Sequence, residues 1–159
     1  MKGKFTKYQI DKCMQIIDKV VQLPVSQPFI KKVDPLKDGI RDYLDIIKTP
    51  MSFDVIKSKL SSYSYKEMSE FIQDVELIWE NAKTYNGEDS EVYLMAREAS
   101  LYFNKHIKNL PNSVEEEWIQ KLQKISLKLY KAFKMNPLLA QSKDEGSHSA
   151  PNDKPNNES

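Results

Sequence analysis

Residues 43–51 of the chain read YLDIIKTPM, and residues 84–90 read TYNGEDS. In the first stretch, a tyrosine precedes a loop that closes on a Pro-Met pair at the start of a predicted helix. In the second, a predicted helix ends in an Asn-Gly pair, which favours helix termination and a turn. The two stretches therefore place Tyr43 and Asn86 at loop ends, where neither side chain is needed to fill a core.

The spacing of apolar residues predicts four helices around these stretches. The first follows a capping box at Thr6-x-x-Gln9 and stops before Pro24, because the residue before a proline avoids the helical conformation. The other three are expected at residues 52–60 with Ser52 as the cap, from a capping box at Ser64-x-x-Glu67 to residue 86, and from Asp89 or Ser90 to the Leu110-Pro111 pair. With only four glycines in the chain, this pattern predicts an all-α four-helix bundle.

Residues 24–50 show no persistent helical or strand period and are interrupted by four prolines and a glycine. A connection this long inside a compact domain is usually functional. Three apolar residues are expected to anchor it to the bundle, namely Phe29, Val33 and Leu36.

A fifth helix is predicted after a capping box at Ser113-x-x-Glu116. Its apolar positions 118, 122, 125, 129 and 133 have a coiled-coil-like spacing. This leaves two interpretations, an adaptor that associates through residues 113–134 and, the one we favour, a helix that packs back on the bundle. The expected organisation is a helical domain at residues 1–111, an additional helix at 112–136 packed on it, and a disordered tail at 137–159, where Ser, Asn, Pro and charged residues dominate.

Composition excludes several classes of protein. The net charge is +1 and all but two of the 24 basic residues are lysines, so strong direct nucleic-acid binding is not expected. No apolar run approaches the roughly 20 residues that span a bilayer, and the N-terminus lacks the apolar segment of a signal peptide. The single cysteine, Cys13, excludes an internal disulfide and fits a reducing compartment. These features predict an intracellular protein without a membrane segment.

No catalytic constellation is visible either. The two histidines, His106 and His148, are far apart in the sequence and make no metal-binding spacing with Cys13. No nucleophile, base and orienting acid occur together, and glycine-rich phosphate loops are absent. We therefore expect no enzymatic activity, no metal and no cofactor.

Together with Gln27-Pro28-Phe29, the two opening stretches resemble the motifs of the bromodomain, the acetyl-lysine reader of chromatin proteins. The resemblance covers roughly residues 6–110 with the motifs in the family's order, and it is closest to the BET-type (bromodomain and extra-terminal) subgroup. It implies a left-handed four-helix bundle with a long first inter-helix loop. It further implies a non-catalytic nuclear protein that regulates transcription by binding acetylated tails of histone H3 or H4, or other acetylated proteins. Because the fifth helix is expected to pack on the bundle, we expect the protein to be a monomer.

The resemblance also assigns roles to residues of the site. Asn86 matches the side-chain donor to the acetyl oxygen, and Tyr43 matches the tyrosine that reaches this oxygen through a water. The remaining matches line the pocket: Tyr85 beside the asparagine, Pro28 and Phe29 as a shelf, Val33 and Ile40 as a loop wall, and Val92 as the gatekeeper.

Two positions depart from the family pattern. Gln27 stands where many relatives have tryptophan, and Asp38 stands where close relatives usually have leucine. These departures keep open a degenerate bromodomain without ligand. Trp79, Met51 and Met95 are expected in the core rather than in the site.

Overall fold

The structure is a computed structural model of the chain and describes residues 4–136. The predicted disordered tail at residues 137–159 lies outside the described residues. The chain forms two compact units, Met1–Val114 and Glu115–Ser159.

All secondary structure in the described residues of the first unit is helical. The elements are α1 (Lys7–Val21), the 3₁₀ helix η1 (Pro24–Phe29), α2 (Tyr43–Ile46), α3 (Phe53–Ser61), α4 (Met68–Asn86) and α5 (Glu91–Ile107). The prediction of an all-α bundle of four main helices is confirmed.

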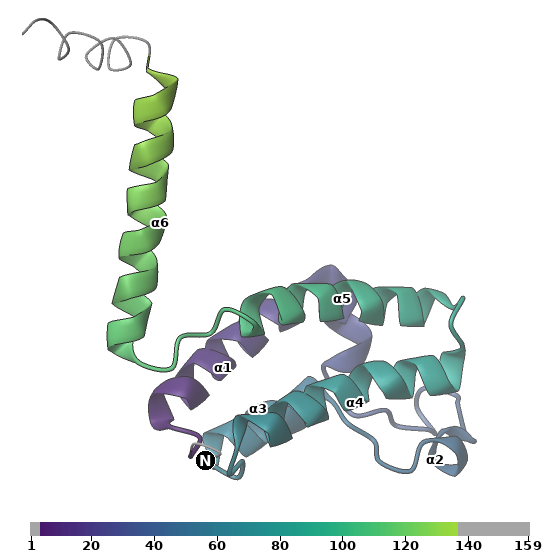
Figure 1. Cartoon of the computed structure of the whole chain (residues 1–159). Helices are drawn as coiled ribbons and strands as arrows, with labels where there is room; N and C mark the ends of the chain where they lie inside the picture. Colours follow the sequence, from purple (N-terminus) through teal and green to yellow (C-terminus); the bar gives the residue numbers. More distant parts are fainter. Residues whose placement is uncertain (1–3, 137–159) are drawn as a thin grey trace, which may run out of the picture. The chain divides into compact units, whose positions relative to one another are not determined.

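The four main helices pack around one core (Figure 1). α1 contacts α3 and α5, and α4 contacts the same two helices, so each helix has two neighbours. The long connection between α1 and α3 returns to the bundle twice, because η1 packs against α1 and α5 and α2 packs against α4. The α4–α5 turn and α2 thus lie at the same end of the bundle (Figure 1).

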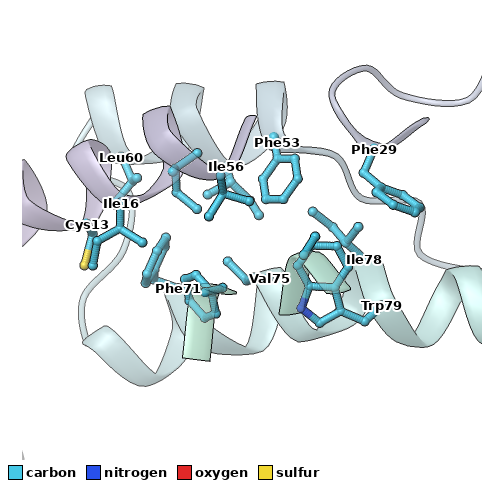
Figure 2. Packing of buried hydrophobic residues seen from close by; sticks show 14 of the residues in the cluster. Cys13, Ile16, Phe29, Phe53, Ile56, Leu60, Phe71, Val75, Ile78 and Trp79 are labelled. Atoms are coloured by element: carbon cyan, nitrogen blue, oxygen red, sulfur yellow. The ribbon is translucent and has the colours of Figure 1, made fainter. Parts of the chain in front are cut away.

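The core is rich in aromatic rings and β-branched side chains. Phe71 is fully buried and lies against Phe103, with ring centroids 5.9 Å apart. Trp79 packs edge-on against Phe53 and Phe29, each at 5.6 Å (Figure 2). Offset and edge-on ring pairs of this kind add stability beyond the burial of their area. The expected core position of Trp79 is confirmed, and Met51 and Met95 pack against the same cluster.

The predicted helix caps are right in three places. The Thr6 capping box is complete, since Gln9 N–H donates to the Thr6 hydroxyl at 3.2 Å and Thr6 N–H donates to the Gln9 side chain at 3.0 Å. Ser90 caps α5 through the N–H of Tyr93 at 3.1 Å. α4 ends at Asn86, with Gly87 as its C-cap.

Two other caps are corrected by the structure. Ser52 occupies the N-cap position of α3 as predicted, but its side chain makes no capping hydrogen bond. The N–H of Asp54 donates instead to the Ile30 carbonyl of the long connection at 2.9 Å. The Ser64 capping box does not form either. α4 begins only at Met68, with Glu67 in the N-cap position.

The long connection also differs from the prediction. Residues 24–50 contain two short helices, η1 and α2, whose lengths are too small for a periodic signal. Phe29 anchors the connection as expected with an exposed fraction of 7%, and Val33 is partly buried. Leu36 is wrong as an anchor, because its exposed fraction is 78%.

α6 (Val114–Met135) runs from the end of the first unit through the second and is the predicted fifth helix. Three glutamates lie in its first turn and Lys134 lies in its last, an arrangement that the helix dipole favours. None of the residues of α6 is buried.

Candidate functional site

A cavity of about 820 Å³ opens at the end of the bundle where α4 stops. Its walls come from η1, the connection that follows, the last turns of α4 and the first turn of α5. The structure brings all eight residues expected at the site to this cavity: Pro28, Phe29, Val33, Ile40, Tyr43, Tyr85, Asn86 and Val92. The long connection and the α4–α5 region, which are far apart in the sequence, thus share one pocket.

The Asn86 side chain stands at the last position of α4. Gly87 follows with φ 86° and ψ 161°, a combination that is essentially restricted to glycine. This residue turns the chain away so that the helix stops. The Asn86 amide nitrogen donates to the Ala82 carbonyl at 3.0 Å. A side-chain amide carries two N–H donors, so this bond orients the group and leaves the second donor for a ligand.

Two tyrosines form an aromatic wall beside the asparagine. The rings of Tyr43 and Tyr85 meet edge-on with centroids 5.0 Å apart. The Tyr85 hydroxyl donates to Asp42 at 2.8 Å, and this hydrogen bond raises the pKa of Tyr85. Burial raises the pKa of Tyr43, whose exposed fraction is 7%. Both hydroxyls therefore keep their protons at neutral pH and can act as hydrogen-bond donors.

The apolar part of the cavity begins at η1. Phe29 is held edge-on against Trp79, so its ring is fixed by the core. Pro28 and Gln27 precede it and are exposed. Gln27 lines the cavity with a polar side chain where the resemblance would place a tryptophan, so the outer part of the shelf is smaller and more polar.

Asp38, the second departure from the family pattern, holds the loop together. Its carboxylate accepts the N–H of Asp34 at 2.8 Å. The Asp34 carboxylate in turn accepts the N–H groups of Leu36 and Lys37 at 3.2 and 3.3 Å. Asp38 also lines the cavity. Its hydrogen bond to the backbone of Asp34 gives it a structural role, which is to form the turn. Its place among the lining residues makes this wall of the cavity polar.

Both ends of the connection are tied to the bundle. The N–H of Asp54, in the first turn of α3, donates to Ile30 O at 2.9 Å. The Asn81 side chain, on α4, donates to Thr49 O at 2.9 Å. These two bonds hold the loop at the edges of the cavity.

Sequence reasoning missed several lining residues. On α4 these are Ile78, Asn81 and Ala82. Ile78 and Ala82 precede Asn86 by eight and four residues and share its helix face, so helical spacing from Asn86 could have identified them. In the long connection they are Ile30, Lys31, Lys32, Asp34 and Lys37, and no periodic signal points to these five. Met51 packs against the core as expected, but the expectation that it lies outside the site is wrong, because it also lines the cavity.

No group of histidine, cysteine, aspartate and glutamate residues in the described part of the chain could hold a metal ion. Within residues 4–136, no helix is long and apolar enough to cross a membrane. The chemistry available at the cavity is hydrogen bonding from Asn86 and the tyrosines beside an apolar surface.

Comparison with known proteins agrees with this geometry. The family model for the bromodomain matches residues 13–98. The SWR1 complex bromodomain subunit bdf1 of Schizosaccharomyces pombe is 38% identical over 101 residues, which cover 64% of this chain and 18% of the relative. An ankyrin repeat, bromo and BTB domain-containing protein of Dictyostelium discoideum is 37% identical over 108 residues, 68% of this chain and 12% of the relative.

A bromodomain-containing protein of the same organism is 34% identical over 119 residues, 70% of this chain and 8% of the relative. The chain thus spans less than a fifth of the length of these relatives. The matched region contains the long connection, the end of α4 and the start of α5, which together form the cavity. The chain belongs to the bromodomain family, whose domains are acetyl-lysine readers and generally non-catalytic.

Proposed function

We propose that this chain binds acetylated lysine on the tails of histone H3 or H4, or on other nuclear proteins, and thereby takes part in the regulation of transcription. The observation that carries the proposal is the meeting of Asn86, Tyr43 and Phe29 at one cavity. It acts by binding alone, in the nucleus, and as a monomer. The name of the Schizosaccharomyces pombe relative, a SWR1 complex subunit, supports a role in a chromatin-associated complex.

The cavity suits an acetylated lysine for a physical reason. The acetamide is neutral and offers one carbonyl acceptor and one methyl group. An unmodified lysine ends in an ammonium ion, and moving that ion into an apolar site costs several kcal/mol. The Asn86 amide would donate to the acetyl oxygen, Tyr43 would reach the same oxygen through a water, and Phe29 would pack on the methyl.

The lining residues have supporting roles in this proposal. Tyr85, fixed by Asp42, keeps the Tyr43 ring in place. Pro28, Val33 and Ile40 contact the aliphatic part of the lysine side chain. Val92, at the start of α5, sets the width of the opening. Because one such pocket contacts few ligand atoms, its affinity is expected to be modest and to rise when several sites are engaged together.

The test is calorimetric titration of the chain with acetylated histone H3 and H4 peptides and with their unacetylated counterparts, after a peptide array has selected the sites. We expect measurable heat only with acetylated peptides. Equal binding of both forms would contradict the proposal. Binding of neither form would favour a degenerate bromodomain.

A further inference from the structure

One side of the cavity mouth is basic. Lys31, Lys32 and Lys37 line the cavity from the connection that follows η1, and all three are exposed. The lining residues on the opposite side, at the end of α4 and the start of α5, are uncharged. The charge of the mouth therefore comes from the loop side alone.

The carboxylates of Asp34 and Asp38, on the same side, do not neutralise all three lysines. Asp38 and Asp34 accept hydrogen bonds from the loop's own backbone. Asp34 also lies 3.8 Å from the ammonium of Lys37 and pairs with it. Within residues 4–136, Lys31 and Lys32 have no ion-pair partner. Two adjacent, unpaired cations thus remain beside the Phe29 shelf.

We infer that the preferred ligand is an acetylated lysine with an acidic residue beside it in the peptide. The inference rests on the proposed function, since the acetylated side chain must occupy the cavity for its neighbours to reach the mouth. A peptide in that position crosses the rim formed by Lys31 and Lys32. An aspartate or glutamate next to the acetyl-lysine pairs with these ammonium groups, whereas a lysine there is repelled.

The surroundings favour a peptide carboxylate over a nucleic-acid backbone. Duplex recognition uses an extended basic stripe. Here two free lysines lie next to Asp34 and Asp38, and Asp42 follows shortly in the chain. Such alternation of charge repels a continuous row of phosphates but accommodates one carboxylate.

The preference is of the size expected for exposed ion pairs. One or two such pairs correspond to about a two- to tenfold change in affinity. Screening reduces the interaction as salt rises, because the Debye length falls from about 10 Å at 0.1 M to about 3 Å at 1 M ionic strength. The selectivity should therefore shrink at high salt.

The experiment compares three acetyl-lysine peptides of equal length that differ only in the residues beside the acetyl-lysine, which are glutamate, glutamine or lysine. An unacetylated version of each is included. The proteins are the full chain, K31Q/K32Q, the charge reversal K31E/K32E, and the matched control K7Q/K105Q. Lys7 and Lys105 are exposed and lie near the start of α1 and the end of α5, away from the α4–α5 turn (Figure 1).

We expect the unaltered chain and the control to prefer the glutamate peptide over the glutamine peptide about two- to tenfold. K31Q/K32Q should bring this ratio close to one, and K31E/K32E should reverse the order in favour of the lysine peptide. A ratio near one in the unaltered chain, or a ratio that both Lys31/Lys32 variants leave unchanged, overturns the inference while acetyl-dependent binding stands.

Loss of acetyl dependence in every peptide overturns the proposed function as well. A duplex DNA probe forms the last arm. If the variants weaken DNA binding and leave the peptide ratios unchanged, the two lysines are a nucleic-acid surface and the inference is wrong.

Discussion

The side chain of Asn86 has two N–H donors with different partners. One holds the Ala82 carbonyl within α4, and the other is the proposed donor to the acetyl oxygen. An amide fixed by its own helix meets a ligand without first searching for an orientation, which reduces the entropic cost of binding. Placement at a helix end, next to the cavity, would give the Asn86 amide its proposed function.

Replacing Asn86 with alanine should weaken binding of an acetylated peptide about 5- to 150-fold, which corresponds to the loss of about 1–3 kcal/mol for an unpaired acceptor. The melting temperature should change little, because the buried residues of α4 from Phe71 to Ala82 are untouched. Tyr43→Phe should cost less, since it removes only a water-mediated link. Calorimetric titration of the three proteins measures both effects, and an unchanged affinity of the alanine variant would refute the assignment of Asn86.

Cys13 should be inert in the folded protein. The residue is fully buried, and burial raises the pKa of its thiol to about 12. At pH 8 only about one thiol in ten thousand would be ionised, and the thiolate is the reactive form. Iodoacetamide should therefore modify the chain slowly in buffer and rapidly in guanidinium chloride, as followed by intact mass; rapid modification of the native chain would contradict the buried position.

The raised pKa of Cys13 also makes the stability of the fold depend on pH. The folded pKa lies above the unfolded value, so the contribution of Cys13 to stability is fully present below the unfolded pKa, near 8.5. It is lost progressively as the pH rises from there towards about 12. Cys13→Ala should lessen this alkaline loss of stability.

At the scale of the elements, the turn between α4 and α5 depends on one glycine. Gly87 has φ 86° and ψ 161°, and a side chain there would meet open space. The constraint is therefore in the backbone rather than in packing. Gly87→Ala should lower stability by about 1–3 kcal/mol, seen as a drop of several degrees in the melting temperature, and should weaken peptide binding by displacing Asn86.

The matched control for this substitution is Glu76→Ala, which changes an exposed residue on the same helix. It should leave melting and binding close to those of the unaltered chain. An alanine at position 87 that melts and binds like the control would show that the turn tolerates another backbone conformation.

The helix ends show where sequence patterns succeed and where they fail. Thr6-x-x-Gln9 forms a capping box, and a further contact of the Gln9 side chain, from its Nε2 to Asn112 Oδ1 at 3.2 Å, leaves the capping atoms in place. At Ser64 the same local pattern meets tertiary constraints. Tyr65 is buried and donates to Asp74 at 2.7 Å, and the carbonyl of Lys66 accepts the N–H of Phe5 at 3.2 Å. These contacts hold residues 65 and 66 outside the helix, and no local pattern encodes them.

For α6 we propose that the apolar face packs on the bundle. Trp118→Ala should then lower the free energy of unfolding by a few kcal/mol, as for other large truncations in a core. Chemical denaturation measures this change. Leu127→Ala is a useful control, because position 127 lies outside the coiled-coil-like set of apolar positions.

At the scale of the whole molecule, the same proposal predicts a monomer at micromolar concentration. Light scattering during gel filtration tests it. A stable dimer that Trp118→Ala dissociates would instead support the adaptor, in which residues 113–134 mediate association between chains.

A shortened chain of residues 1–114 should fold and bind acetylated peptide with the affinity of the full chain. All members of the core cluster and all cavity-lining residues lie between Phe5 and Leu110. Circular dichroism and titration check this expectation. The melting temperature of the shortened chain, compared with that of the full chain, also measures how much α6 contributes.

Much of this molecule could be predicted from its sequence, because each main helix has a clear apolar period and because motif residues such as Asn86 and Tyr43 stand in a recognisable order. The cavity brought together every residue expected there. What escaped prediction depends on contacts between distant segments. The Ile30 carbonyl, rather than the Ser52 hydroxyl, accepts the N–H of Asp54. The turn formed by Asp34 and Asp38 leaves the Leu36 side chain exposed to solvent.

The two bonds that tie the long connection to α3 and α4, from Asp54 to Ile30 and from Asn81 to Thr49, have a kinetic consequence. Since the pocket walls are already in position, association needs no slow rearrangement and should proceed at about 10⁵–10⁷ M⁻¹s⁻¹ or faster. A micromolar affinity then implies residence times on the order of 0.1–10 seconds or shorter. Each encounter with a mark would be brief, so the protein would sample acetylation repeatedly and follow its removal without delay.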